Sequence, residues 1–491
     1  MPQPTTHPPE GRAPHVVVVG GGISGLAAGA AVRRQRPDVT VTVLEAALAI
    51  GGKLHLAEVA GITVDVGAEA MLNRRPEAVS LARDSGLGDK IVHPRTISAS
   101  LWSRGQMRPM PRTMMGVPTD ARVLAESGVI SKAGLARAAL DAVLPATRLD
   151  DRDVSIGWLV EERFGKEVVD RLVEPLLGGV YAGHAREISA RAAVPQVVAL
   201  LDQDRSLMRA AAAATGAPGP DAPPVFAGLV GGVGSLPPAV AESAGLVVRT
   251  GATVRELARA SAGGWQLVVG SPADPEIVHA DAVVLATPPR ATGRLLADVA
   301  PDAALEVARI ESASMAVITL AFRSRDVPEG LRQGATSGFL VPPVDRRRVK
   351  AATYSFSKWD WVRDAGRGAL DGEDVLLVRC SIGRHREEQV LQVDDTELVQ
   401  MALEDLADAA GLSVRPVECH VQRWGGGLPQ YAVGHLDRVR HIRASVARVP
   451  GLAVCGAAYD GLGIPACIAS AEKAASLILD GLPDREPRRG E

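Results

Sequence analysis

The apolar positions near the start of the chain predict a strand, a helix and a second strand. Residues 16–19 are four consecutive valines, enough for one buried parallel strand. Residues 26–36 are typical of a helix that follows this strand, and residues 39–44 of a second buried strand. The sheet that these strands begin must be completed by segments from elsewhere in the chain.

Later segments repeat both kinds of pattern. Apolar residues at steps of three and four predict helix over 153–201, with Pro175 bending or restarting it. Residues 395–411 predict an amphipathic helix, and residues 469–479 a closing helix. The Ala-, Gly- and Pro-rich residues 210–221 predict a linker. The segments expected to be strands are 246–254, 265–269, 277–280, 282–285, 310–322, 338–341, 351–357, 375–382 and 452–456.

Composition limits the class of protein. At 491 residues the chain is too long for one ordinary core, so two or three domains are expected. A formal net charge of -3 argues against a nucleic-acid partner. The cysteines lie far apart, which favours unpaired thiols in a reducing compartment and no metal site: Cys380, Cys419, Cys455 and Cys467.

Two features bear on location. Residues 1–14 lack an apolar signal segment and are expected to form a flexible tail. No run reaches the roughly 18 apolar residues that span a bilayer. We therefore expect a cytoplasmic protein that at most contacts the inner face of a membrane.

The loop between the first strand and the helix carries the first candidate chemistry. Gly20, Gly22 and Gly25 occupy the three glycine places of G-x-G-x-x-G. They allow a tight turn, backbone contact with a pyrophosphate, and close packing of helix on strand. Glu45 follows the second strand, twenty positions after Gly25, where a carboxylate accepts hydrogen bonds from a ribose 2′-hydroxyl. This order predicts a Rossmann-like dinucleotide site.

Two further tight segments favour FAD over NAD. Gly51-Gly52-Lys53 and Gly67-Ala68-Glu69-Ala70 suit a second passage of the chain along a long, extended cofactor. With these segments the sequence resembles the superfamily of FAD-containing amine oxidases and protoporphyrinogen oxidases.

Five longer motifs narrow the resemblance to the porphyrinogen oxidases of heme biosynthesis. The most specific is RLVEPLLGGVYAG at 171–183. The others are MMGVP at 114–118, GFLVP at 338–342, SFSKW at 355–359 and LPQYAVGH at 428–435. Within that family the chain is most similar to the water-soluble, oxygen-dependent coproporphyrinogen III oxidases of bacteria. It departs from the family pattern at Ala466, where members usually carry an acid, and at 67–70, which often reads G-P-[DE]-S.

The resemblance implies an α/β and α+β architecture like that of p-hydroxybenzoate hydroxylase and the amine oxidases. A Rossmann-like FAD-binding domain would comprise 15–72, 222–298 and 415–491. Residues 299–414 would form a mixed-sheet substrate-binding domain, and 73–209 an inserted, basic helical domain. The implied FAD contacts are Gly20, Gly21, Gly22, Ile23, Ser24, Gly25, Glu45, Ala46, Lys53, Gly67, Ala68, Glu69, Ala70, Val254, Trp424, Leu462, Gly463 and Ile464. The N-terminus of the closing helix would stabilise negative charge on the reduced flavin ring.

The implied reaction is the six-electron oxidation of coproporphyrinogen III to coproporphyrin III, with three O2 reduced to three H2O2. The flavin carries the redox chemistry, so no catalytic side chain is required. Four propionates on this substrate make basic residues beside the pocket important. The candidate substrate contacts are Arg74, Arg75, Leu340, Lys358 and Ser381. Other enzymes of heme synthesis are expected partners.

Three alternatives remain open: a protoporphyrinogen IX oxidase, a flavin amine oxidase, and a flavin- or porphyrin-binding protein without turnover. An amine oxidase normally surrounds its flavin with an aromatic cage, whereas aromatics make up only 3% of this chain. Between residues 73 and 148, twelve basic residues face six acidic ones. This excess indicates either a solvated surface or a site for a polyanion or anionic lipid.

Overall fold

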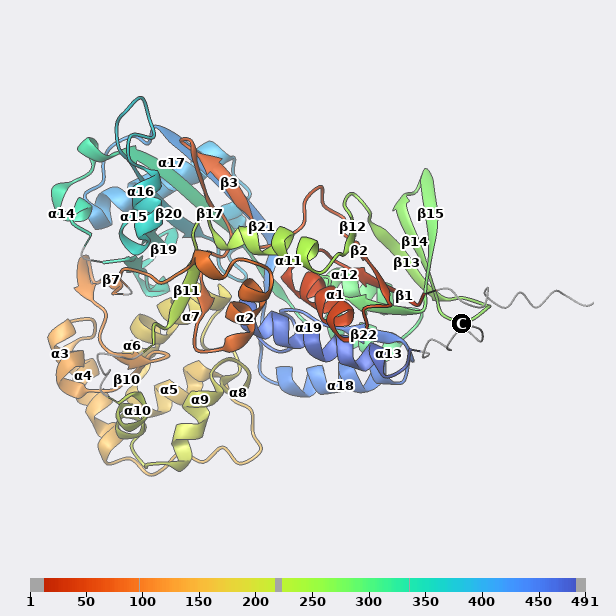
Figure 1. Ribbon diagram of the computed structural model, residues 1–491. Helices are drawn as coiled ribbons and strands as arrows, with labels where there is room; N and C mark the ends of the chain where they lie inside the picture. Colours follow the sequence, from red (N-terminus) through yellow and green to blue (C-terminus); the bar gives the residue numbers. More distant parts are fainter. Residues whose placement is uncertain (1–12, 97, 217–222, 335, 483–491) are drawn as a thin grey trace, which may run out of the picture.

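The computed structural model describes residues 13–96, 98–216, 223–334 and 336–482. Figure 1 shows one lobe built on a parallel sheet and, beside it, a second sheet above a group of helices. The tail expected at 1–14 lies outside the described residues up to residue 12. Pro14 is already fixed, because its carbonyl accepts a hydrogen bond from the Thr40 amide at 2.8 Å.

The first lobe contains the predicted dinucleotide-type sheet. Its five parallel strands are in the order β12-β2-β1-β16-β22. They are β1 (His15–Val19), β2 (Thr40–Leu44), β12 (Val247–Arg249), β16 (Ala282–Leu285) and β22 (Leu452–Val454). The valines of β1 are buried on both faces, as an uninterrupted apolar run requires in a central parallel strand. All five strands fall in segments that the sequence predicts to be strands.

Both faces of this sheet are covered. On one face the core contains residues of α1 (Ile23–Gln35), α2 (Pro76–Asp84), α11 (Leu236–Ser243) and α19 (Ile464–Leu479). On the other it contains residues of the antiparallel sheet β13 (Val254–Arg259), β14 (Trp265–Ser271) and β15 (Asp274–Ala280), and of α12 (Pro289–Leu296), α13 (Pro301–Ala308) and α18 (His435–Ala447). The predicted hairpin at 265–280 is confirmed. The closing helix begins five residues earlier than predicted, because Pro465 can occupy its first turn.

The second lobe contains a seven-stranded sheet in the order β21-β17-β20-β19-β18-β7-β8. Its strands are β7 (Ser100–Ser103), β8 (Gln106–Pro109), β17 (Ser312–Arg323), β18 (Gly338–Leu340), β19 (Val349–Tyr354), β20 (Val375–Ile382) and β21 (Glu418–Pro429). Every pairing is antiparallel except that of β18 with β7, so the sheet is mixed, as the resemblance implies. The amphipathic helix α17 (Asp395–Ala410) packs on one face, as predicted.

Strand pairing differs from the expected domain division at both ends of this sheet. β21 was assigned to the FAD-binding domain, and β7 and β8 to the helical domain. The sequence of β21, ECHVQRWGGGLP, hides its strand character because most of it is partly solvent-exposed and three glycines interrupt it. β7 and β8 are four residues each, too short for an alternating pattern to stand out.

Below the second sheet, short helices pack around a separate core. They are α3 (Ala121–Ser127), α4 (Lys132–Ala139), α5 (Ile156–Phe164), α6 (Lys166–Val168), α7 (Glu174–Tyr181), α8 (Ala190–Ala193), α9 (Pro195–Val198) and α10 (Leu207–Thr215). A π-helical segment, η3 (Val169–Val173), precedes α7, and Pro175 lies in the first turn of α7, so the helix restarts there as predicted. The linker expected at 210–221 is wrong for 210–215. These residues continue α10, because alanine is the strongest helix former and Ser206 caps the first turn.

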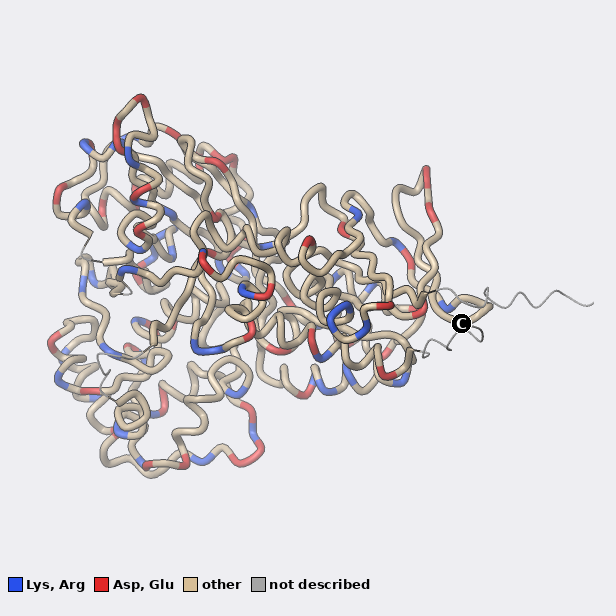
Figure 2. The backbone as a smooth tube through the Cα atoms, in the orientation of Figure 1, with Lys and Arg blue, Asp and Glu red and all other residues tan. Residues whose placement is uncertain are grey.

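Several arginines of the basic segment 73–148 have structural contacts. Arg137 donates to the carbonyl groups of Arg163, Glu161 and Glu162 at the end of α5. Arg112 donates to the Thr215 carbonyl at the end of α10. Charged residues of both signs are spread along the chain (Figure 2). Among the described residues, no helix has the length and apolar character to cross a bilayer. Contact with anionic lipid stays a prediction.

Candidate functional site

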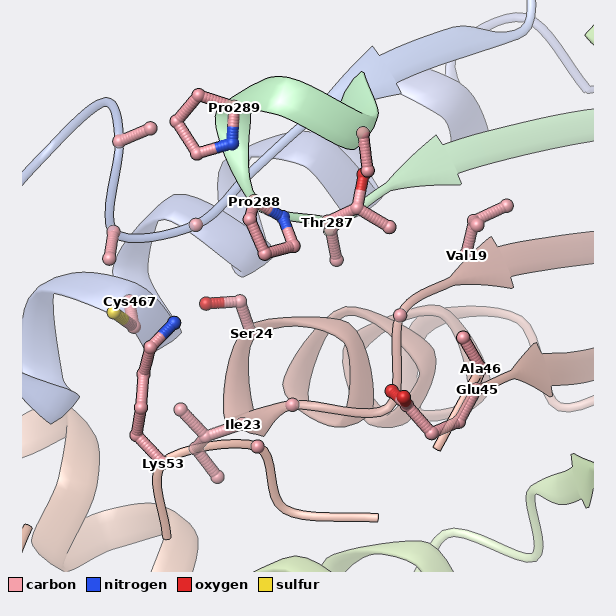
Figure 3. Close-up of a pocket in the computed structure, with 18 of the residues that line it drawn as sticks. Val19, Ile23, Ser24, Glu45, Ala46, Lys53, Thr287, Pro288, Pro289 and Cys467 are labelled. Atoms are coloured by element: carbon pink, nitrogen blue, oxygen red, sulfur yellow. The ribbon is translucent and has the colours of Figure 1, made fainter. Parts of the chain in front are cut away.

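A cavity of about 350 Å³ lies at the carboxyl ends of β1, β2 and β16. Ligands bind at this edge in open parallel sheets, because the loops there leave a crevice. Figure 3 shows Val19, Ile23, Ser24 and Glu45 on one side of the cavity and Thr287 and Pro288 on another. The first turn of α19 closes one end with Ile464 and Cys467.

The three motif glycines have different surroundings. A Cβ at Gly20 would lie 2.8 Å from the Ala286 carbonyl oxygen, and its φ of +110° favours glycine. A Cβ at Gly25 would overlap the Gly20 carbonyl oxygen. A Cβ at Gly22 would meet no atom within 4 Å, although Gly22 lines the cavity. Gly20 and Gly25 therefore shape the turn, whereas Gly22 leaves room for a ligand beside the backbone.

Glu45 is fixed at the end of β2 by backbone donors. Its Oε2 accepts from the Gly21 amide at 2.6 Å and its Oε1 from the Ala47 amide at 2.8 Å. A carboxylate has about four acceptor positions, so both oxygens keep capacity for a further donor. Glu45 and Ala46 line the cavity, where a ribose hydroxyl would reach them.

The second glycine loop lies directly against the first. The Gly51 amide donates to the Gly21 carbonyl at 2.8 Å, and Gly51 and Gly22 form a β-bridge. Lys53, two residues after Gly51, directs its ammonium group between Ser24 and Cys467 (Figure 3). Lys53 is exposed and lines the cavity, and desolvation by the surrounding protein lowers its pKa from 10.5. An anionic ligand beside Lys53 would favour its charged form, so this residue is suited to a phosphate or an electron-rich ring edge.

The third tight segment, 67–70, connects the cavity to the seven-stranded sheet. A Cβ at Gly67 would lie 3.2 Å from Cζ2 of Trp424, so the β21 indole packs directly on this loop. Glu69 forms ion pairs with Lys358 and with Arg379, the latter at 2.5 Å. Burial would raise the Glu69 pKa, but these two cations outweigh it and lower the pKa to about 2. Glu69 is therefore an ionised carboxylate that joins the loop to the sheet.

The predicted cofactor residues divide into two groups. The cavity is lined by Gly20, Gly22, Ile23, Ser24, Glu45, Ala46, Lys53, Ala68, Val254, Leu462 and Ile464. The others do not line it: Gly21, Gly67, Glu69, Ala70 and Gly463 lie in the neighbouring loops, Gly25 lies in α1, and Trp424 lies in β21. Direct contact with a cofactor stays a prediction for all of them.

Sequence reasoning missed one wall of the cavity. Thr287, Pro288 and Pro289 follow β16, and Ala291 and Arg294 follow in α12. The Pro-Pro pair after an apolar strand signalled only the end of that strand. Its position at the carboxyl end of a parallel strand was the signal that could have identified it as part of the site.

The predicted substrate residues lie on two different parts of the molecule. Phe339 and Cys380 belong to the core under α17, so their neighbours Leu340 and Ser381 face the opposite side of the sheet. Cδ2 of Leu340 lies 3.8 Å from where a Cβ of Gly179 would be, so it faces α7. Lys358 is engaged by Glu69.

Arg74 and Arg75 lie outside this region. Arg74 is exposed, and Arg75 forms an ion pair with Glu77. The structure therefore does not bring the two arginines together with Leu340 and Ser381 in one described pocket.

Two buried cations near Leu340 were not predicted. Lys350 is 2% exposed, and its Nζ lies 3.7 Å from the Met315 sulfur. Arg384 is 5% exposed and donates to the Val341 carbonyl at 3.1 Å. Burial, with a smaller contribution from the Arg384 charge, lowers the Lys350 pKa to about 7. No described carboxylate forms an ion pair with Lys350. Burial lowers the Arg384 pKa, and the charges of Glu387 and Glu174 partly oppose this shift.

The two long motifs meet beside the cavity. Gln430 of LPQYAVGH donates to the Tyr181 carbonyl of RLVEPLLGGVYAG at 2.8 Å. The neighbouring Tyr431 donates its hydroxyl to the Ala457 carbonyl at 2.6 Å, and Ala457 lines the cavity. The motifs thus connect the helical region to the wall of the site. The described residues contain no cluster of three or more His, Cys, Asp or Glu that could hold a metal ion.

Comparison with known proteins agrees with this geometry. The family model described as flavin-containing amine oxidoreductase matches residues 23–479. The chain belongs to the flavin-containing amine oxidoreductase family. Members of this family carry a flavin, and the open backbone at Gly22 with Lys53 and Glu45 nearby suits a flavin nucleotide. The chain is therefore a flavin-dependent oxidoreductase.

Among members of this family, the chain is 37% identical to coproporphyrinogen III oxidase of Mycobacterium tuberculosis, covering 95% of this chain and 97% of that protein. It is 30% identical to coproporphyrinogen III oxidase of Bacillus subtilis, covering 95% and 98%. A crystal structure from Exiguobacterium sp. 255-15, assigned as a protoporphyrinogen oxidase, superimposes with a TM-score of 0.82 at 29% identity, covering 95% and 99%.

Proposed function

We propose that this protein oxidises coproporphyrinogen III to coproporphyrin III with bound FAD, passing six electrons to three O2. The similarity to coproporphyrinogen III oxidases over nearly the full length of both chains is the observation that carries the proposal. When bound, the flavin accepts two electrons in each of three steps and returns them to oxygen as hydrogen peroxide. The protein must bind both molecules, orient them and keep water away.

FAD, rather than FMN, is supported by the length of the cavity. Its lining runs from Glu45 and Val254 past Gly22 to Lys53, Leu462 and Ile464. Glu45 would hold the ribose of the adenosine half, and the backbone at Gly22 would lie against the diphosphate. The N-terminus of α19 would stabilise negative charge on the ring.

The macrocycle would lie on the face of the seven-stranded sheet that carries Leu340 and Ser381. This face carries two buried cations that form no described ion pair, Lys350 and Arg384, and two that pair with Glu69, Lys358 and Arg379. Charged carboxylates of a tetrapyrrole are attracted to such a face, and four propionates gain more from it than two. Pyrrole N–H protons can leave by tautomerisation, so the proposal assigns no side chain as a base.

The test is the turnover of coproporphyrinogen III and protoporphyrinogen IX by the purified protein, followed by porphyrin fluorescence. The proposal expects faster turnover of coproporphyrinogen III. Preference for protoporphyrinogen IX would favour the alternative oxidase, and peroxide released from simple amines would favour an amine oxidase. A double Arg74→Ala, Arg75→Ala variant with unchanged rates on both porphyrinogens would remove these residues from the substrate site.

A further inference from the structure

A second, larger hollow adjoins the flavin cavity. It is a groove of about 1190 Å³ between α12, α13 and the bend of β21. Cavity and groove share Pro288, Pro289, Ala291, Arg294 and Gly426. The groove reaches the surface at Leu305, which is 66% exposed. The groove therefore adjoins the flavin cavity at these five residues and is open to solvent at Leu305.

The walls of the groove suit a small neutral molecule. They consist mostly of alanine, proline, glycine, leucine and isoleucine. Arg294 lies where groove and cavity meet, but its guanidinium is held by the Val254 and Arg255 carbonyls at 3.0 and 3.1 Å. Dioxygen is small, uncharged and apolar, so such walls offer it no desolvation barrier.

The groove is separate from the face proposed for the macrocycle. Leu340, Ser381 and Lys358 do not line it, and neither does any residue of α7. A tetrapyrrole held between the sheet and α7 would therefore cover a different part of the flavin cavity from the part that the groove reaches.

The stoichiometry of the proposed reaction favours a route for O2 and H2O2 that is separate from the site of the tetrapyrrole. Each two-electron oxidation of the porphyrinogen must be followed by transfer of two electrons and two protons to one O2, with release of one H2O2. Three such cycles are needed per macrocycle. If the partly oxidised tetrapyrrole stays bound between cycles, oxygen must arrive and peroxide must leave past it or by another path.

We infer that the groove between α12, α13 and β21 is the passage for O2 and H2O2, used while the tetrapyrrole remains bound. The inference rests on the proposed function for its biological use. The path itself depends only on the shared lining of cavity and groove.

The test narrows the groove at two depths. Ala291→Phe fills the junction, where Ala291 lines both hollows, and Ala297→Trp narrows the exposed outer part. Ala213→Trp, on the exposed side of α10 far outside the groove, is the matched control. The first measurement is quenching of the bound-flavin fluorescence by dissolved O2, which requires no turnover. The second is stopped-flow kinetics, with anaerobic reduction by coproporphyrinogen III followed by reoxidation.

Both groove variants should show weaker O2 quenching and slower reoxidation, with Ala291→Phe slowing it at least about tenfold. Anaerobic reduction should keep its wild-type rate in Ala297→Trp, which lines the groove but not the cavity, and Ala213→Trp should change neither quantity. Unchanged quenching and reoxidation in Ala297→Trp and Ala291→Phe would overturn the inference. Slower anaerobic reduction with normal quenching would also overturn it, because the groove would then admit the porphyrinogen. If coproporphyrinogen III fails to reduce the wild-type flavin, the proposed function fails, while the quenching comparison still tests the passage.

Discussion

Residues 20–25 and 45–53 form a cradle around the cavity at the end of β1. This cradle and the face of the seven-stranded sheet that carries Leu340 and Ser381 are built by different means. In the cradle, backbone groups form the site: the amides of Gly21 and Ala47 hold Glu45, and Gly22 leaves space for a ligand. On the sheet face, charged side chains dominate, with Glu69 binding Lys358 and Arg379. Glu69 and its partners are separated by 289 and 310 positions in the sequence.

This difference explains what each region tolerates. A backbone site depends on the absence of side chains, so adding a methyl group is the damaging change. A buried cluster of charged side chains is stable only while opposite charges are paired, so removing one charge leaves the others buried without a partner. We therefore expect Glu69→Gln to change stability, and Gly22→Ala, whose added methyl group meets no protein atom within 4 Å, to change cofactor binding alone.

Gly25→Val should have the largest effect, because its Cβ would overlap the Gly20 carbonyl oxygen between β1 and α1. We expect loss of bound flavin and loss of soluble, folded protein, measured by absorbance and circular dichroism of the purified fraction. A soluble, yellow Gly25→Val protein would contradict the assignment of this glycine to strand–helix contact.

Glu69→Gln should destabilise the fold by about 3 kcal/mol, because Lys358 and Arg379 lose a buried carboxylate. Since the folded pKa of Glu69 is about 2, below its ordinary value of 4.5, the stabilisation is fully present above pH 4.5. It is lost as pH falls from 4.5 towards 2, so wild type and variant should converge there in denaturant titrations. Asp364→Asn, which removes an exposed pair with Arg367, is the control and should cost no more than about 0.5 kcal/mol.

Lys350→Met should instead stabilise the protein, by about 2–4 kcal/mol at pH 7, because it removes a buried cation that has no carboxylate partner. A lysine with a folded pKa of about 7 and an unfolded value of 10.5 holds fewer protons in the folded state. Wild-type stability should therefore rise with pH between 7 and 10.5, and the variant should lose this rise. Lys132→Met, at an exposed position on α4, should change stability by less than about 0.5 kcal/mol. A destabilised Lys350→Met protein would show that an unrecognised anion balances this lysine.

Gly22→Ala should have the smallest effect on folding and a specific one on the cofactor. Its φ of −72° and ψ of 172° are accessible to alanine, and no atom lies within 4 Å of the added methyl. The apoprotein should keep its melting temperature. FAD affinity should fall about tenfold, or 1.4 kcal/mol, in calorimetric titration, because the methyl occupies the place proposed for the diphosphate. Unchanged affinity would place the diphosphate elsewhere.

The same contrast decides how much the sequence alone could reveal. The cradle can be predicted from the sequence because a turn, a helix start and an acid lie within 31 residues, His15 to Glu45, with fixed spacing. The ion-pair cluster around Glu69 cannot be predicted in this way, because nothing in the sequence near Glu69, Lys358 or Arg379 indicates that they are in contact. The place of β21 beside β17 is hidden for a related reason: it follows from long-range pairing rather than local pattern. Nothing in the sequence around Lys350 indicates that it is buried, since burial of a lysine depends on the neighbours that the fold supplies.

Anaerobic mixing of the yellow protein with coproporphyrinogen III tests the proposed cofactor site and the proposed substrate site in a single measurement. The account predicts that the flavin absorbance bleaches as soon as the porphyrinogen is added and returns when air is admitted, with porphyrin fluorescence appearing. A protein that contains FAD but keeps its colour under these conditions would contradict the placement of a tetrapyrrole opposite the cradle.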